Sequence, residues 1–177
     1  MTRVCLVGKA DVNLQYELLS RETAREALST YDLREPYENA VGVETVSLGA
    51  AVALLNDLDW YLVRFVDEAM VLEPSVSEDE WLSRDLAAAV RDDELAPGDT
   101  ERFLKLYGLE PPSGDDADPV TGDATAEAST DPGGGDRPRK LVEPMYVTRT
   151  GDGLPSYDLR DVEETLVERV TEAEFGA

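Results

Sequence analysis

Residues 43–65, VETVSLGAAVALLNDLDWYLVRF, predict the centre of the fold. Val41–Val46 alternates apolar and polar residues, which is typical of a strand. Ser47 or Gly49 can begin a short helix, because the residues that follow are small and apolar. Trp60–Val66 is rich in aromatic and β-branched residues and predicts another strand. The segment therefore predicts a strand, a helix and a second strand in close succession.

Further elements flank this unit on both sides. Arg3–Gly8 predicts a buried strand, and a helix is expected over about residues 13–31, or a short strand followed by a helix capped by Ser20. The later predictions are a turn or bulge at Asp67–Glu68, a strand over Ala69–Leu72, a helix from the capping box at Ser77 to about Asp92, and a helix capped by Asp99 and ended by Gly108.

The composition changes after residue 109. Residues 110–136 hold eight acidic and no basic side chains, with few apolar ones, so we expect a disordered acidic linker over 110–139. Leu141–Val147 predicts an edge strand because it contains Pro144. A last helix is expected from Asp158, with the apolar stripe Leu159, Val162, Leu166, Val170 and Ala173.

These elements predict one core domain and a dependent C-terminal unit. Residues 1–109 are expected to form an α/β or α+β domain, a two-layer sandwich of a small mixed sheet with helices. The strand and helix of residues 140–177 are too short to form a stable core alone. We therefore expect this unit to dock on the core domain, on a second copy of the chain, or on another protein.

The overall composition excludes several classes of function. The chain has 177 residues, no His and one Cys. Ser-His-Asp and Cys-His catalytic sets, His metal sites and an internal disulfide are therefore excluded. Close carboxylates could bind a hard cation, but such pairs are expected by chance in so acidic a chain. We therefore expect neither a metal site nor a cofactor.

The charge indicates a salt-rich environment. The formal net charge is −23, and only three residues are lysine, at Lys9, Lys105 and Lys140. Such a surface repels itself in dilute solution, whereas molar salt shortens the Debye length to about 3 Å. We expect a cytoplasmic protein of a halophile, with neither a signal peptide nor a membrane span. An acidic partner-binding surface in a mesophilic protein is the alternative.

Four blocks of the sequence together resemble an uncharacterised protein family of halophilic archaea. They are Met1–Gly8, Leu18–Tyr31 (LLSRETAREALSTY), Val43–Phe65 and Trp81–Asp93 (WLSRDLAAAVRDD). The resemblance covers about residues 1–109. It implies a halophilic, cytoplasmic protein with no assigned activity, and it carries over no functional residues.

Two basic residues are the candidate ligand-binding residues. Lys9 follows the first strand and precedes a helix, where anions often bind, although an ordinary turn is the commoner explanation. Arg64 lies within the predicted strand Trp60–Val66 and needs a carboxylate or phosphate partner if it is buried. The basic cluster Arg137–Lys140 could contact a nucleic acid, but no RNA-binding motif accompanies it.

The sequence favours a non-catalytic interaction or regulatory domain that binds an unknown protein partner or itself. The alternative is a binder of small anionic ligands, or an enzyme, that uses Lys9 and Arg64 with carboxylates. Nucleic-acid binding is less favoured. The two leading hypotheses differ in whether these cations and acids converge in a concave site.

Folding should depend on salt, because the net charge is −23 and molar KCl screens its repulsion. The thermal midpoint, followed by circular dichroism, should rise strongly from dilute buffer to molar KCl. A midpoint that does not change with KCl would contradict the halophilic interpretation.

Overall fold

The computed structural model describes residues 1–110, 138–149, 157–158, 161–162 and 164–176. The predicted linker, apart from its two ends, lies outside the described residues. Within the described ranges, no helix is both long enough and apolar enough to cross a membrane.

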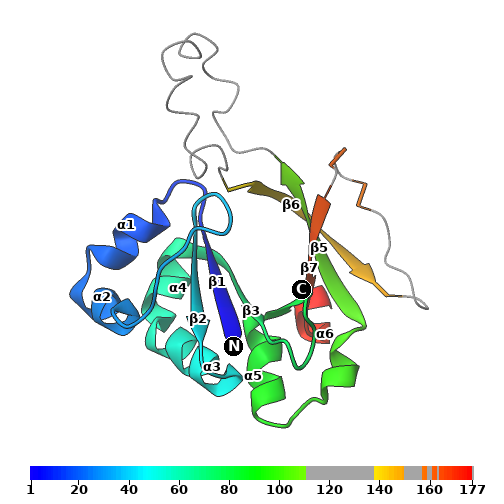
Figure 1. The fold of residues 1–177 in the computed structure, drawn as a ribbon. Helices are drawn as coiled ribbons and strands as arrows, with labels where there is room; N and C mark the ends of the chain where they lie inside the picture. The colour runs from blue at the N-terminus through cyan, green and yellow to red at the C-terminus, as the bar shows by residue number, and fades with distance from the viewer. Residues whose placement is uncertain (111–137, 150–156, 159–160, 163, 177) are drawn as a thin grey trace.

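In the described part of the chain, seven strands form one mixed sheet in the order β2-β1-β3-β4-β7-β5-β6 (Figure 1). The strands are β1 (Thr2–Gly8), β2 (Ala40–Thr45), β3 (Val66–Leu72), β4 (Trp81–Ser83), β5 (Phe103–Glu110), β6 (Lys140–Thr148) and β7 (Glu164–Arg169). Neighbouring strands are antiparallel, except that β4 and β7 are parallel. The predicted mixed fold of strands and helices is confirmed.

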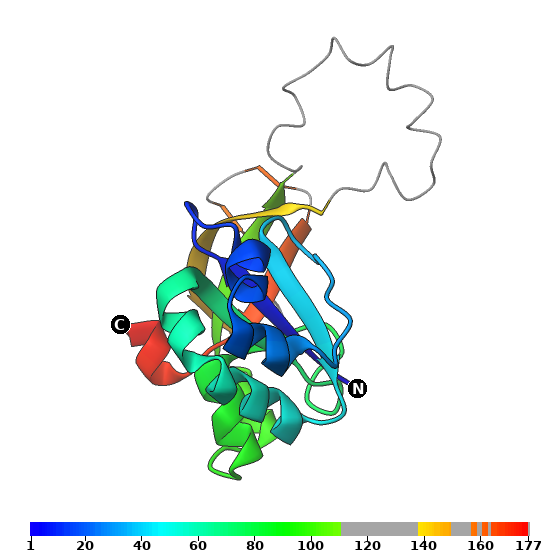
Figure 2. The same ribbon diagram turned by 90° about the vertical axis from the view of Figure 1, so that its left-hand side faces the viewer.

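Helices cover one face of the β2-β1-β3-β4 half of the sheet (Figure 2). They are α1 (Leu14–Leu19), α2 (Glu22–Leu28), α3 (Leu48–Asp57), α4 (Asp59–Phe65) and α5 (Arg84–Arg91). A 3₁₀ turn, η1 (Pro97–Thr100), precedes β5, and α6 (Glu172–Gly176) follows β7. The α6 helix packs on β5, where the rings of Phe175 and Phe103 have their centroids 5.0 Å apart.

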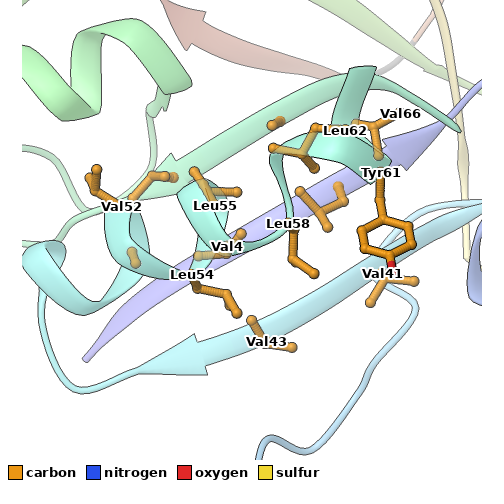
Figure 3. Packing of buried hydrophobic residues seen from close by; sticks show 14 of the residues in the cluster. Val4, Val41, Val43, Val52, Leu54, Leu55, Leu58, Tyr61, Leu62 and Val66 are labelled. Atoms are coloured by element: carbon orange, nitrogen blue, oxygen red, sulfur yellow. The ribbon is translucent and has the colours of Figure 1, made fainter. Parts of the chain in front are cut away.

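The α3 helix forms where the sequence predicts it. The Ser47 hydroxyl accepts a hydrogen bond from the Ala50 amide at 3.1 Å, so Ser47, not Gly49, caps the helix. The apolar residues of α3 then face β1 and β2, where Val52 and Leu55 pack over Val4 (Figure 3). This cluster is the main hydrophobic core.

The predicted strand Trp60–Val66 is wrong. Asp59–Phe65 forms α4, and the chain enters β3 only at Val66. Tyr61 and Leu62 are buried against the core, whereas Trp60 is exposed. Burial of one helical side of this segment outweighs the β-propensity of its aromatic and branched residues. Of the turn or bulge predicted at Asp67–Glu68, the turn is wrong, because both residues lie within β3. The bulge is confirmed, because Glu68 pairs with Val7 and Val66 pairs with Gly8, which leaves Asp67 as an extra residue in β3.

Two other predicted helices are strands. Residues 103–110, expected to be largely helical, form β5, and the end of the predicted C-terminal helix forms β7. Residues 166–170 are buried without interruption, which is typical of a strand covered on both faces. The stripe residue Leu159 lies outside the described residues.

Two predicted helix boundaries also differ from the structure. The helix expected over residues 13–31 is interrupted near Ser20 and becomes α1 and α2. The Ser77 hydroxyl does accept a hydrogen bond from the Glu80 amide at 3.0 Å, but the next element is the strand β4. Ser83 caps the following helix, α5, through the Leu86 amide. The capping-box pattern at Ser77 therefore marks a turn.

The sheet curves so strongly that β3 and β5 face each other across its second side. Lys105 on β5 contacts Glu68 on β3, although β4 and β7 lie between these strands in the sheet. The enclosed face buries Cys5, Met70, Trp81, Tyr107 and Leu166. This second core connects the two halves of the sheet.

Both outer edges of the sheet are protected. On the free side of β2, Arg34 and Gly42 exchange backbone hydrogen bonds of 2.9 and 2.7 Å. At the other edge, β6 contains Pro144, which has no amide to donate. The prediction that Leu141–Val147 is an edge strand is confirmed.

Replacing Leu166 should unfold much of the protein, because Leu166 is buried in the second core. We expect Leu166→Asp to lower the free energy of unfolding by about 3–5 kcal/mol, measured by urea denaturation in molar KCl. Thr165→Asp is the matched control, since Thr165 is exposed on the same strand. Equal losses in the two variants would argue against the register of β7.

Candidate functional site

Lys9 lies at the C-terminal end of α4. Its amide donates to the Phe65 carbonyl at 3.0 Å, and its Nζ donates to the Val63 carbonyl at 3.2 Å. Carbonyl groups at a helix C-terminus attract cations. The ammonium of Lys9 therefore stabilises the end of α4.

Asn39 fixes the loop between β1 and α1. Its φ angle is 58°, and its side chain accepts from the Leu14 amide and donates to the Lys9 carbonyl, both at 3.0 Å. A Cβ on Gly8 would lie 2.7 Å from the Asn39 Nδ2, so this close approach requires glycine. Amides at the start of α1 already have protein acceptors. Anion binding at Lys9 stays a prediction.

Arg64 lies on the exposed side of α4. Its guanidinium donates to the Trp60 carbonyl at 3.3 Å and lies 3.9 Å from the centroid of the Trp60 ring. Among the described residues, no carboxylate pairs with Arg64. Arg64 is therefore held against an aromatic ring with its charge open to a partner.

Arg21 approaches the same aromatic ring from the start of α2. Its guanidinium carbon lies 5.3 Å from the ring centroids of both Trp60 and Phe65, and its guanidinium pairs with Glu17 at 3.6 Å. Two arginines thus share one tryptophan. Both candidate residues predicted from the sequence therefore involve α4. Arg64 lies within this helix, and Lys9 donates a hydrogen bond to its Val63 carbonyl.

Large apolar side chains are exposed beside these cations. Trp60 is 45% exposed and Val63 is 64% exposed. We call the surface formed by Arg21, Trp60, Val63 and Arg64 the α4 face. Sequence reasoning selected Arg64 but missed Trp60 and Val63, because it assigned them to a strand. Val63 and Arg64 follow Trp60 by three and four residues. This spacing is the signal that could have placed all three on one helical side.

A second polar group is buried inside the curved sheet. Glu68 accepts hydrogen bonds from Lys105 Nζ at 2.5 Å and from the Tyr107 hydroxyl at 3.0 Å. Glu168 on β7 is 0% exposed, and neither of its oxygens accepts a hydrogen bond from a described donor. Its carboxyl group lies beside that of Glu68, and a hydrogen bond between the two favours the protonated form of Glu168. We call Glu68, Lys105, Tyr107 and Glu168 the interior cluster.

Burial decides the charge states of the interior cluster. Burial, followed by the negative charge of Glu68, raises the pKa of Glu168 well above its ordinary value. Burial lowers the pKa of Lys105, but the nearby Glu68 outweighs it and raises that pKa overall. Burial and the same two acids raise the pKa of the Cys5 thiol. Burial and Glu68 therefore favour the protonated form of Glu168. Burial likewise favours the thiol form of Cys5, which is not the nucleophilic form.

A cleft of about 670 Å³ lies at the end of β1. Tyr107 lines it and connects it to the interior cluster through its hydroxyl. Asp11, Glu35 and Asp67 also line the cleft. In the described part of the chain, no three Cys, Asp or Glu side chains are arranged to hold a metal ion. Lys140 lines the cleft as well, so the cleft offers several carboxylates, one ammonium group and a phenol to a small ligand.

Comparison with known proteins identifies a family to which this chain is similar. Residues 2–109 match the Family of unknown function (DUF5804). The chain belongs to this family. No curated protein and no solved structure matches it. The DUF5804 segment includes the α4 face and β1 to β5 almost entirely, whereas β6 and β7 lie beyond it.

The interior cluster predicts an unusual pH dependence. Because the folded pKa of Glu168 is raised, its contribution to stability is complete below the unfolded pKa. That contribution is lost as the pH rises from there through the raised folded value. Glu168→Gln should therefore increase the free energy of unfolding at pH 8 by about 1–3 kcal/mol and have little effect at pH 4.

Urea denaturation in molar KCl at the two pH values measures this effect. Glu172→Gln is the control, because it removes the same charge from an exposed position. A loss of stability in Glu168→Gln at pH 8 would mean that the folded protein needs an ionised carboxylate at this position.

Proposed function

We propose that this DUF5804 protein is a non-catalytic interaction domain of the high-salt cytoplasm of a halophilic archaeon. In this proposal it binds a partner protein through the α4 face. The carrying observation is the exposed Trp60 held against Arg64 at 3.9 Å, with Arg21 at 5.3 Å.

The side chains of the α4 face are those that dominate protein interfaces. Tryptophan and arginine are enriched among residues whose truncation costs most binding energy. The contacts with the arginines restrict the Trp60 ring before a partner arrives, which reduces the entropy lost on binding. Tyr16, which is 66% exposed on the neighbouring α1, would extend the contact area.

The same contacts support a partner that presents a carboxylate. Arg64 pairs with no described carboxylate, and guanidinium groups bind carboxylates through two parallel hydrogen bonds. In molar salt, charges farther apart than about 3 Å are screened from each other. Direct contact with Arg64 and Trp60, not long-range attraction, would then determine specificity.

Composition supports the proposed environment. The net charge of −23 and the three lysines favour a salt-rich cytoplasm, where the repulsion is screened. The sequence blocks that resemble a family of halophilic archaea support the same origin.

A small-ligand binder remains the second candidate, and the 670 Å³ cleft favours it. Lys9 and Arg64 do not line this cleft, whereas four carboxylates and one ammonium group, that of Lys140, do. A cationic ligand would therefore suit the cleft better than the anionic ligand expected from the sequence. Mass spectrometry of metabolites that copurify in molar KCl would detect it.

Val63→Asp tests the α4 face with a matched control. Val63 and Val46 are both exposed valines, at 64% and 80%, so either can accept a charge without unfolding the core. Tagged wild type and both variants would be used for affinity capture in molar KCl, followed by quantitative mass spectrometry. We expect a protein captured by wild type and Val46→Asp to fall at least about tenfold with Val63→Asp. Identical captures by the two variants would contradict the proposal.

A further inference from the structure

β7 fills a slot between two strands that do not pair with each other. Leu82 on β4 lies opposite Arg169 in a parallel ladder, and β5 pairs with the whole of β7 in an antiparallel one. The segment that matches the family ends at residue 109. Within that segment, β4 and β5 each have an edge that pairs with β7, a strand from outside it.

The outward side of β7 fits this slot well. Arg169 donates to Glu80 at 2.7 Å and to the Thr100 hydroxyl at 2.9 Å. The same Glu80 also accepts from Arg149 at 2.6 Å. Because Arg169 is buried and Glu80 is nearly so, this contact selects a strand with a guanidinium at this position.

The inward side of β7 fits less well. Leu166 is buried in the second core, but two residues later the buried Glu168 carboxyl accepts from no described donor. It faces the Glu68 carboxylate, with which it can share a hydrogen bond only while it is protonated. Ionisation of this acid inside the protein and beside a second carboxylate is unfavourable. A strand with a neutral side chain at this position would fit the slot better than the resident strand.

We propose that the slot between β4 and β5 is a strand-binding site, from which an extended segment of a partner protein displaces β7. The partner segment would carry an apolar residue at the position of Leu166, a neutral residue at that of Glu168 and an arginine at that of Arg169. Its backbone would pair with both slot edges, as in other cases of strand addition. This inference does not rest on the α4 face, which lies on the helical side of the molecule.

Displacement should become easier as the pH rises. The groups that face or approach Glu168 are Cys5 from β1, Glu68 from β3, Lys105 and Tyr107 from β5, and Glu174 from α6. Lys105 favours the ionised form of Glu168, whereas burial, Glu68 and Glu174 favour the protonated form. Ionisation at high pH therefore weakens the resident strand but not a neutral competitor.

A labelled peptide tests the slot in the full chain. The probe is a fluorescent peptide of residues 162–171 that carries Glu168→Gln, added to the wild-type protein in molar KCl. Fluorescence anisotropy should show saturable binding that is tighter at pH 8 than at pH 5. A peptide that also carries Arg169→Glu should bind at least about tenfold more weakly, because it repels Glu80.

The resident strand supplies the control. A full chain with Glu168→Gln should bind the probe more weakly than wild type at pH 8, because its own β7 is better matched. Hydrogen exchange of Leu166 and Val167 should also slow in that variant. Absence of probe binding, or binding that is equal for both chains and both peptides, would overturn the proposal. Exchange of β7 between two copies, seen as a dimer by light scattering, would overturn the assignment to a partner segment.

Discussion

Backbone pairing of β7 with β4 on one side and β5 on the other joins the two halves of the sheet. Without β7, the helix-covered half ends at the short strand β4, and β5 pairs only with β6. The curvature depends on the same pairing, because it brings Lys105 of β5 to Glu68 of β3. Both the second core and the interior cluster therefore depend on a strand that lies near the C-terminus.

The two buried polar residues of β7, Glu168 and Arg169, have opposite effects on the stability of this strand in the sheet. Arg169 exchanges its hydration for an ion pair and a hydroxyl contact, whereas Glu168 loses hydration and can share a hydrogen bond with Glu68 only while it is protonated. Removing one partner of a buried ion pair is strongly destabilising, so Arg169 fixes the strand. Ionisation of Glu168 beside Glu68 is unfavourable, so Glu168 loosens the strand as the pH rises. Of these two adjacent residues, Arg169 thus determines the position of β7 and Glu168 determines how easily β7 is displaced.

Local patterns predicted the elements that a short local signal marks. Arg3–Gly8 is marked by an apolar run, α3 by its cap at Ser47, and the edge strand by Pro144. Trp60–Val66 was misassigned because aromatic and branched residues favour strands unless a core lies on one helical side, and that is a tertiary property. β7 was misassigned for a related reason: Leu166 and Val170 have helical spacing, but the residues between them are buried as well.

The candidate sites were predictable to different degrees. Arg64 could be selected because an arginine among apolar residues is uncommon in any context. Glu168 could not be selected, since it is one of 39 acidic residues and nothing near it in the sequence marks it as buried. Only the long-range pairing of β7 distinguishes it from the rest.

Protection of the two sheet edges becomes more important in concentrated salt. In dilute solution, a charge of −23 would itself keep copies of the chain apart. Salt that screens this repulsion also removes that safeguard against edge-to-edge strand pairing. The backbone bonds between Arg34 and Gly42, and the missing amide of Pro144, do not depend on ionic strength. Resistance to aggregation at high salt would then come from the two outer strands, which offer fewer free backbone hydrogen-bonding groups to another copy of the chain.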